Sequence, residues 1–208
     1  MSLMTNWGYT LTSVDSLPSI LTVEQFNAFT GNKYAGDARV ASNIQAAEAA
    51  VRNYCGWHVT TALACKVSTT FFNYSVTKKP CGFLMQLPAA YVTAVSSVEI
   101  DGVAHDKFVF EPNGILRVYG LSWHGLHEYS TIDVVYTAGI TEAMAVGIRE
   151  LIAHRVTHAL ASSNGVQSET AGGVSITYSA NWINNSRATA LADDNKEVLA
   201  PYVVKGVF

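Results

Sequence analysis

Residues 37–57 read DARVASNIQAAEAAVRNYCGW, and this stretch has the clearest periodicity of the chain. Apolar side chains recur there at alternating steps of four and three, which is the pattern of one buried helix face. They are Val40, Ile44, Ala47, Val51 and Tyr54. Asp37 is a favourable N-cap and Gly56 a favourable C-cap. The stretch therefore predicts a helix over residues 37–55, with enough alanine on its other faces for neighbouring helices to approach closely.

Further helical patterns lie on both sides of this stretch. Upstream, Thr22 and Gln25 have the spacing of a capping box ahead of a short apolar run that ends at Gly31. Downstream, apolar residues keep a 3.6-residue period from 145 to 161 behind a plausible N-cap at Thr141. A last helix is expected over residues 186–199, and Pro201 is expected to end it.

The middle of the chain, from residue 58 to residue 136, is rich in β-branched and aromatic residues with frequent turn signals. Expected strands are 59–67, 69–74, 83–87, 92–100, 107–111, 115–119 and 131–136, with a later one at 174–178. Asp101-Gly102 and Pro112-Asn113-Gly114 are tight-turn signals. Residues 98–119 therefore predict a three-stranded antiparallel meander.

This order of elements predicts an α+β protein, in which a bundle of about four helices carries an inserted antiparallel β lobe. The predicted helical core is discontinuous and comprises residues 20–57 and 139–208. The inserted β domain is 58–138, and residues 1–19 form an N-terminal extension.

Composition limits the classes of function. Of the 208 residues, 49% are hydrophobic and 14% charged, and the net charge is −3. A protein that binds nucleic acid through its phosphates needs clustered Lys and Arg. With its negative net charge, this chain is not expected to bind nucleic acid in that way. Cys55, Cys65 and Cys81 lack CxxC spacing and are expected to be reduced thiols. The pattern predicts neither a signal peptide nor a membrane span.

The strongest catalytic candidate is a histidine pair, His154 and His158, four residues apart on one predicted helix. This spacing can hold zinc, with Glu150 as a third ligand, and would make the protein a metal-dependent hydrolase. Arg155, however, stands where a zincin has its general base. The simpler interpretation is a polar helix face.

A second candidate is an aromatic loop with Trp123, His124 and His127, next to Tyr119 and Tyr129. It would suit a carbohydrate-contacting β module in a virion or tail protein, or else a hairpin connection whose tryptophan packs on the sheet. No catalytic, cofactor-binding or metal-binding set is predicted for this chain, and we expect no enzyme.

Three strings together resemble the head–tail connector (adaptor) family of tailed bacteriophages and prophages. The first is the helix exit Tyr54-Cys55-Gly56-Trp57, and the second is the strand 132–140, IDVVYTAGI, which leads into a helix. The third is 168–179, SETAGGVSITYS, followed by a helix and Leu199-Ala200-Pro201-Tyr202. The resemblance covers about residues 20–204.

The resemblance implies a structural subunit, twelve copies of which form a ring beneath the portal protein. DNA passes through the ring without sequence-specific binding, and a downstream neck, stopper or tail protein docks on it. The implied location is the virion, with assembly in the host cytoplasm, and no cofactor or membrane is implied.

The resemblance also assigns two segments by position. The segment that docks on the portal would contain Pro201, Tyr202, Val203, Val204 and Phe208. The loop that faces the channel would contain Ser163, Gly165, Gly172 and Gly173. An apolar tail of this kind usually marks an interface; the alternative is that it folds back onto its own domain.

Overall fold

The computed structural model describes residues 3–12, 14–70, 76–79, 81–121, 129–161, 168–171, 174–177 and 193–204. The chain divides into two compact units. The sheet unit comprises Met1–Pro18, Cys55–Glu142 and Tyr202–Phe208. The helical unit comprises Ser19–Tyr54 and Ala143–Pro201.

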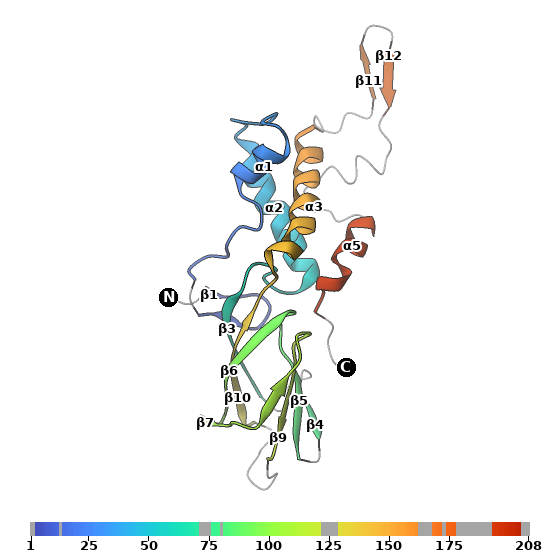
Figure 1. Cartoon of the computed structure of the whole chain (residues 1–208). Helices are drawn as coiled ribbons and strands as arrows, with labels where there is room; N and C mark the ends of the chain where they lie inside the picture. The colour runs from blue at the N-terminus through green and yellow to red at the C-terminus, as the bar shows by residue number, and fades with distance from the viewer. Residues whose placement is uncertain are drawn as a thin grey trace. The chain divides into compact units, whose positions relative to one another are not determined.

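The larger sheet of the sheet unit has six strands in the order β1-β2-β3-β10-β6-β7, all antiparallel to their neighbours (Figure 1). They are β1 (Leu3–Met4), β2 (Thr10–Leu11), β3 (Leu63–Thr70), β6 (Val92–Ile100), β7 (Val103–Ala104) and β10 (Thr131–Ala138). In β10 buried side chains alternate with less buried ones, as expected for a strand with one face on the core. Because it pairs with β3 on one side and with β6 on the other, strand β10 forms the centre of this sheet.

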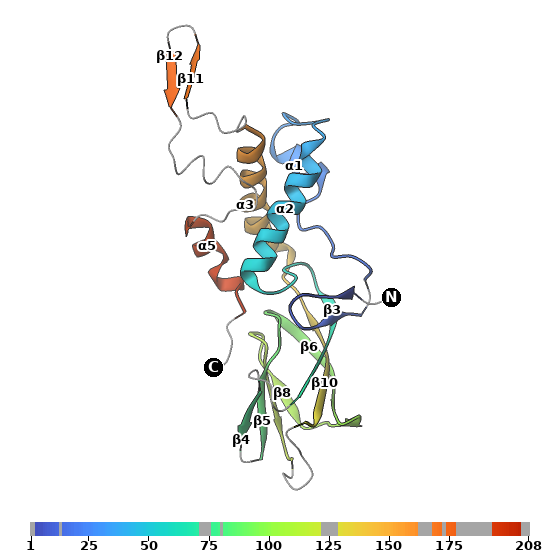
Figure 2. The ribbon, with the colours of Figure 1, turned by 180° about the vertical axis from the view of Figure 1, so that it is seen from behind.

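The second sheet has four strands in the order β4-β5-β9-β8 (Figure 2). They are β4 (Val76–Lys79), β5 (Gly82–Gln86), β8 (Phe108–Phe110) and β9 (Ile115–Tyr119). Phe83 and Met85 of β5 and Leu116 and Val118 of β9 are almost completely buried. These four side chains give the second sheet its apolar core face.

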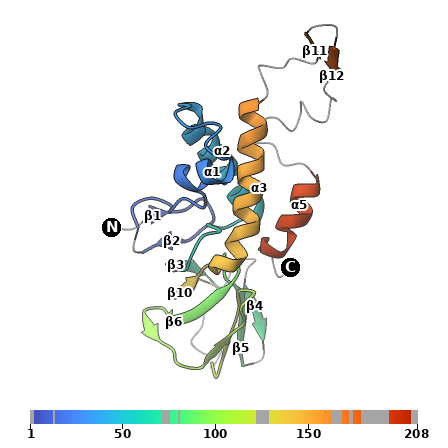
Figure 3. The same ribbon diagram turned by 45° about the horizontal axis from the view of Figure 1, so that its top comes forward.

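The helical unit contains α1 (Val23–Phe29), most of α2 (Arg39–Cys55) and of α3 (Glu142–Ala161), and α5 (Asp193–Leu199). A 3-10 turn, η2 (Ala200–Tyr202), follows α5, and a two-stranded ribbon pairs β11 (Ser168–Ala171) with β12 (Val174–Thr177). Helices α2 and α3 lie side by side (Figure 3). None of the helices in the described ranges combines the length and apolar character needed to cross a membrane.

The start of α1 follows the sequence prediction closely. The Thr22 hydroxyl accepts from the Gln25 amide at 3.2 Å, and the Gln25 side chain accepts from the Thr22 amide at 3.0 Å. The capping box is therefore confirmed. The predicted helices at 37–55 and 141–161 are confirmed as α2 and α3 with small shifts at their ends.

The predicted fold class was wrong. The described chain is built mainly of antiparallel β-sheet, with strands in sheets of six and four, and is no helical bundle with an inserted lobe. The physical reason is that the large sheet also recruits the N-terminal segment, because Thr10 and Leu11 pair with Lys66 and Cys65 of β3. Two-residue strands such as β1 and β2 carry no readable periodicity, so the sequence pattern missed them.

Two strand predictions also need correction. Residues 98–119 form no meander: the turn at Asp101-Gly102 joins β6 to the short β7, while β8 pairs with β9 in the other sheet. The predicted strands 59–67 and 69–74 are replaced, as far as the structure describes them, by one strand, β3, because eight consecutive residues of β10 pair with it. Residues 186–192 of the expected last helix, 186–199, lie outside the described ranges, and α5 occupies 193–199.

Candidate interaction surfaces

The C-terminal segment is attached to the sheet unit by its backbone. The indole Nε1 of Trp57 donates to the Tyr202 carbonyl oxygen at 2.6 Å. The Val204 amide donates to the Cys55 carbonyl oxygen at 3.0 Å. Of the predicted docking residues, Pro201 is exposed, Tyr202, Val203 and Val204 are half-buried, and Phe208 lies outside the described ranges.

Aromatic rings surround this attachment. The Trp57 side chain is fully buried. The Tyr91 ring centroid lies 6.2 Å from that of Trp57 and 5.7 Å from that of Tyr202. Burial raises the pKa of the Tyr91 hydroxyl, as does the neighbouring Tyr202 hydroxyl. We call Trp57, Tyr91 and Tyr202 the aromatic anchor.

Next to the aromatic anchor, His58 is completely buried and hydrogen-bonded at both ring nitrogens. Its Nε2 lies 3.0 Å from the Ala138 carbonyl oxygen, which can only accept, so Nε2 carries the hydrogen. Its Nδ1 lies 2.8 Å from the Tyr9 hydroxyl. His58 thereby links the N-terminal segment to the end of β10 inside the sheet unit.

The predicted channel-facing loop lies mostly outside the described residues. Ser163, Gly165, Gly172 and Gly173 all fall there, so the prediction for them stays a prediction. Within the same loop, the strand β11 pairs residue by residue with β12, from Ser168↔Thr177 to Ala171↔Val174.

From residue 42 to residue 53, helix α2 presents an exposed face without charged side chains, although Arg39 is exposed at the start of the helix. Four exposed residues recur on it at steps of three and four, the spacing of one helix face: Ser42, Gln45, Ala49 and Asn53. The opposite face contains the buried Val40, Ile44, Ala47 and Val51. Because no charge needs to be desolvated on the exposed face, it suits contact with another protein surface.

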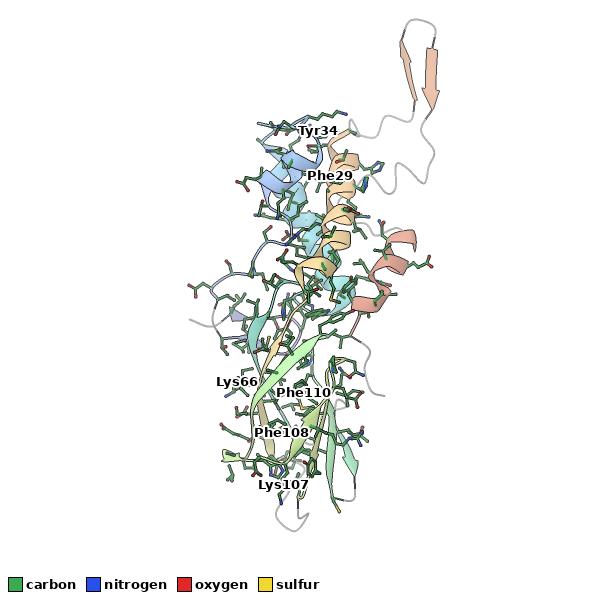
Figure 4. All side chains as sticks on the ribbon, in the orientation of Figure 1. Phe29, Tyr34, Lys66, Lys107, Phe108 and Phe110 are labelled. Carbon is green, nitrogen blue, oxygen red and sulfur yellow. The ribbon has the colours of Figure 1, made fainter. Side chains whose placement is uncertain are left out.

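The histidine pair is not assembled into a metal site. His154, His158 and Glu150 are exposed on α3. The His154 ring contacts the ring of Phe29, labelled in Figure 4, edge to face with centroids 5.2 Å apart. Within the described ranges, no three His, Cys, Asp or Glu side chains gather as metal ligands.

The aromatic loop candidate is only partly described. Trp123, His124 and His127 lie outside the described residues. Tyr129 is 82% exposed and Tyr119 46% exposed on the sheet unit. Among the described residues of this candidate, Tyr119 and Tyr129, the structure therefore shows no aromatic cluster.

The cysteines differ in their surroundings. Cys55 and Cys65 are buried, whereas Cys81 is exposed. Burial raises the pKa of both buried thiols to about 12. Both therefore stay protonated and unreactive near neutral pH.

The sequence alone gave no sign of the aromatic anchor or of the histidine link. Both join residues distant in the chain, with Trp57 and Tyr202 separated by 145 positions. The only available signal was a tryptophan directly after a helix stop, together with an apolar C-terminus. What the described chain offers is a set of surfaces and an anchored terminal segment, as in a structural assembly protein.

Comparison with known proteins gives the family. A model of the head completion protein family matches residues 19–185, and the chain belongs to this family. It is a structural head–tail connector protein. A chain in the solved neck of an empty GTA particle, computed with C6 symmetry, is 17% identical to it; the match covers 95% of this chain and 97% of that chain, with a TM-score of 0.43. No curated protein matches the chain.

Proposed function

We propose that this protein forms a ring of identical subunits beneath the portal of a capsid, and that it has no catalytic activity. In this proposal twelve copies surround the channel through which DNA passes, and a neck, stopper or tail protein docks on the ring. Subunits assemble in the host cytoplasm. The observation that carries the proposal is the match to the head completion family over residues 19–185.

Two features of the described chain support the ring. A ring subunit needs two different surfaces that meet head to tail. The uncharged face of α2 supplies one candidate for such a surface, since Ser42, Gln45, Ala49 and Asn53 are exposed there. The formal net charge of −3 also suits a channel that DNA passes without binding.

The C-terminal segment supports docking on the portal. Tyr202, Val203 and Val204 are apolar or aromatic and only half-buried, so part of their surface stays available to a partner. Burying one such side chain stabilises a complex by roughly 1.5–3 kcal/mol before ordering costs. Phe208 extends this segment in the sequence.

The test is co-purification with the portal protein encoded nearby, using the full chain and a chain that ends at residue 200. We expect the full chain to bind the portal and the shortened chain to lose most of its affinity. Native mass spectrometry of the complex then gives the number of copies. Failure of the full chain to bind any portal would rule the proposal out, and a count other than twelve would correct the ring size.

A further inference from the structure

We infer that Trp57 is a positioning residue, which holds the C-terminal segment in the conformation that docks on its partner. This inference rests on the proposed function, in which that segment binds the portal. It concerns the sheet unit alone, because Trp57, Cys55, Tyr91 and residues 202–204 all belong to it.

Two hydrogen bonds fix the backbone of the segment at neighbouring points. The first joins Trp57 Nε1 to the Tyr202 carbonyl oxygen at 2.6 Å. The second joins the Val204 amide to the Cys55 carbonyl oxygen at 3.0 Å. Two bonds two residues apart set both the place and the direction of the chain. Residues 202–204 are therefore held at a defined place on the sheet unit.

The receiving side of the anchor is itself held in place under strain. Val59 has φ +43° and Tyr91 φ +55°, although neither is glycine, and a β-branched residue such as Val59 rarely adopts a positive φ. Such conformations persist only where surrounding contacts impose them, and they concentrate at functional sites. Here Val59 lies two residues after Trp57 in the sequence, and the Tyr91 ring contacts the Trp57 ring.

Contacts that impose this conformation are present. The Gly139 amide donates to the Tyr91 carbonyl oxygen at 3.2 Å. Next to Val59, the His58 ring is hydrogen-bonded on both sides, to Tyr9 and Ala138. The anchor is thus rigid on the sheet side.

Rigidity here has a consequence for binding. A segment without fixed contacts loses conformational freedom when a partner immobilises it, and this loss weakens the complex. A segment already fixed at Tyr202 and Val204 has lost part of that freedom before docking. Removing the indole N–H should therefore weaken docking even though the Trp57 side chain is fully buried in the subunit.

The central variant is Trp57→Phe, which keeps an aromatic ring and removes the donor. Its matched control is Trp7→Phe, because Trp7 stacks on Tyr9 in the same unit without belonging to the anchor. A second variant, Val204→Pro, removes the other donor without changing the core, and Val204→Ala is its control. Circular dichroism and thermal melting identify any variant that fails to fold.

The first measurement needs no partner. Amide hydrogen exchange at Val204 should become faster in Trp57→Phe than in the wild type, while Val134 in central strand β10 keeps its protection. Equal exchange rates of the Val204 amide in the two proteins would contradict the inference that the Trp57 indole holds the C-terminal segment.

The second measurement is the affinity for purified portal, for each variant in the full chain and in a chain ending at Val204. We expect Trp57→Phe and Val204→Pro to weaken binding of the full chain about three- to ten-fold. The loss should be smaller in the shortened chain, since the anchor then positions only residues 202–204 of the docking segment. An equal loss in both backgrounds, or none in either, would overturn the inference. A wild-type chain that does not bind portal would instead overturn the proposed function, and the inference with it.

Discussion

Glu48 Oε1 lies 2.7 Å from the backbone nitrogen of Ile20, so the carboxylate on α2 accepts a hydrogen bond from the segment that precedes α1. The same oxygen accepts from the Leu21 amide at 2.9 Å and from the Ser19 hydroxyl at 2.6 Å. Glu48 Oε2 lies 3.4 Å from Arg52 one turn later. One buried carboxylate thus satisfies three donors in the helical unit and pairs with a buried cation.

Replacing this carboxylate should destabilise the helical unit strongly. Glu48→Ala leaves the buried amides of Ile20 and Leu21 without their acceptor and leaves Arg52 without this carboxylate. Breaking a buried ion pair by removing one partner costs about 3–5 kcal/mol. Urea unfolding followed by circular dichroism measures the loss. Glu150→Ala, at an exposed position of α3, is the control and should change stability by less than about 0.5 kcal/mol. Equal effects of the two substitutions would contradict the assigned role of Glu48.

Thiol reactivity should separate the three cysteines. Cys55 and Cys65, with pKa values raised to about 12 by burial, should resist a maleimide at pH 7, whereas the exposed Cys81 should react. Mass spectrometry of the labelled native protein should show one adduct, and Cys81→Ser should show none. In urea all three thiols of the wild type should react. Two or three adducts on the native chain would show that the sheet unit opens around Cys55 or Cys65.

Gly139, in the Tyr-Thr-Ala-Gly string, is expected to tolerate no side chain. A Cβ placed there would collide with the backbone of Thr61 and Ala62, which cannot move aside as a flexible side chain would. Gly139→Ala should therefore destabilise the sheet unit by about 3 kcal/mol, at the upper end of overpacking effects. Thermal unfolding measures the change.

The matched control is Gly147→Ala in the interior of α3. Apart from its chain neighbours and the backbone of its own helix, no atom of the described residues lies within 4 Å of a Cβ built at Gly147, and the residue is exposed. Because glycine costs a helix interior about 1 kcal/mol relative to alanine, this substitution should stabilise the protein by about that amount. Opposite signs for the same chemical change would show that backbone proximity explains the glycine at 139.

How far the sequence predicts this fold depends on the range of the interactions concerned. The capping box of Thr22 and Gln25 and the apolar face of α2 are local patterns, and both were predicted correctly. The Asp101-Gly102 turn was also correct, since Glu99 pairs with Ala104 across it. The meander predicted beyond this turn was wrong. Strand β8 joins the other sheet through its pairing with β9, and the residues of β8 alone do not reveal that pairing.

The same distinction applies to the interaction surfaces. The exposed face of α2 follows from helical periodicity, so it can be read from residues 37–55 alone. The anchor between Trp57 and Tyr202 joins a side chain to a backbone carbonyl 145 positions away, and no residue pattern marks such a pair. The assignments of Pro201, Tyr202, Val203, Val204 and Phe208 to docking came from the family resemblance and stay predictions.

The last prediction concerns the contact that α2 would make with a neighbouring subunit in the proposed ring. Ala49 lies in the middle of the uncharged exposed face, so Ala49→Glu adds a charge without disturbing the buried face of the helix. The free subunit should keep its stability within about 0.5 kcal/mol. In a ring, each contact would bury an unpaired carboxylate at a cost of about 3–5 kcal/mol. Negative-stain images of portal complexes should then show incomplete rings, whereas Ala143→Glu, the same change at an exposed position of α3, serves as the control. Complete rings with Ala49→Glu would exclude this face from the subunit contact, because a closed ring repeats every contact around its axis and cannot accommodate the same buried charge at each one.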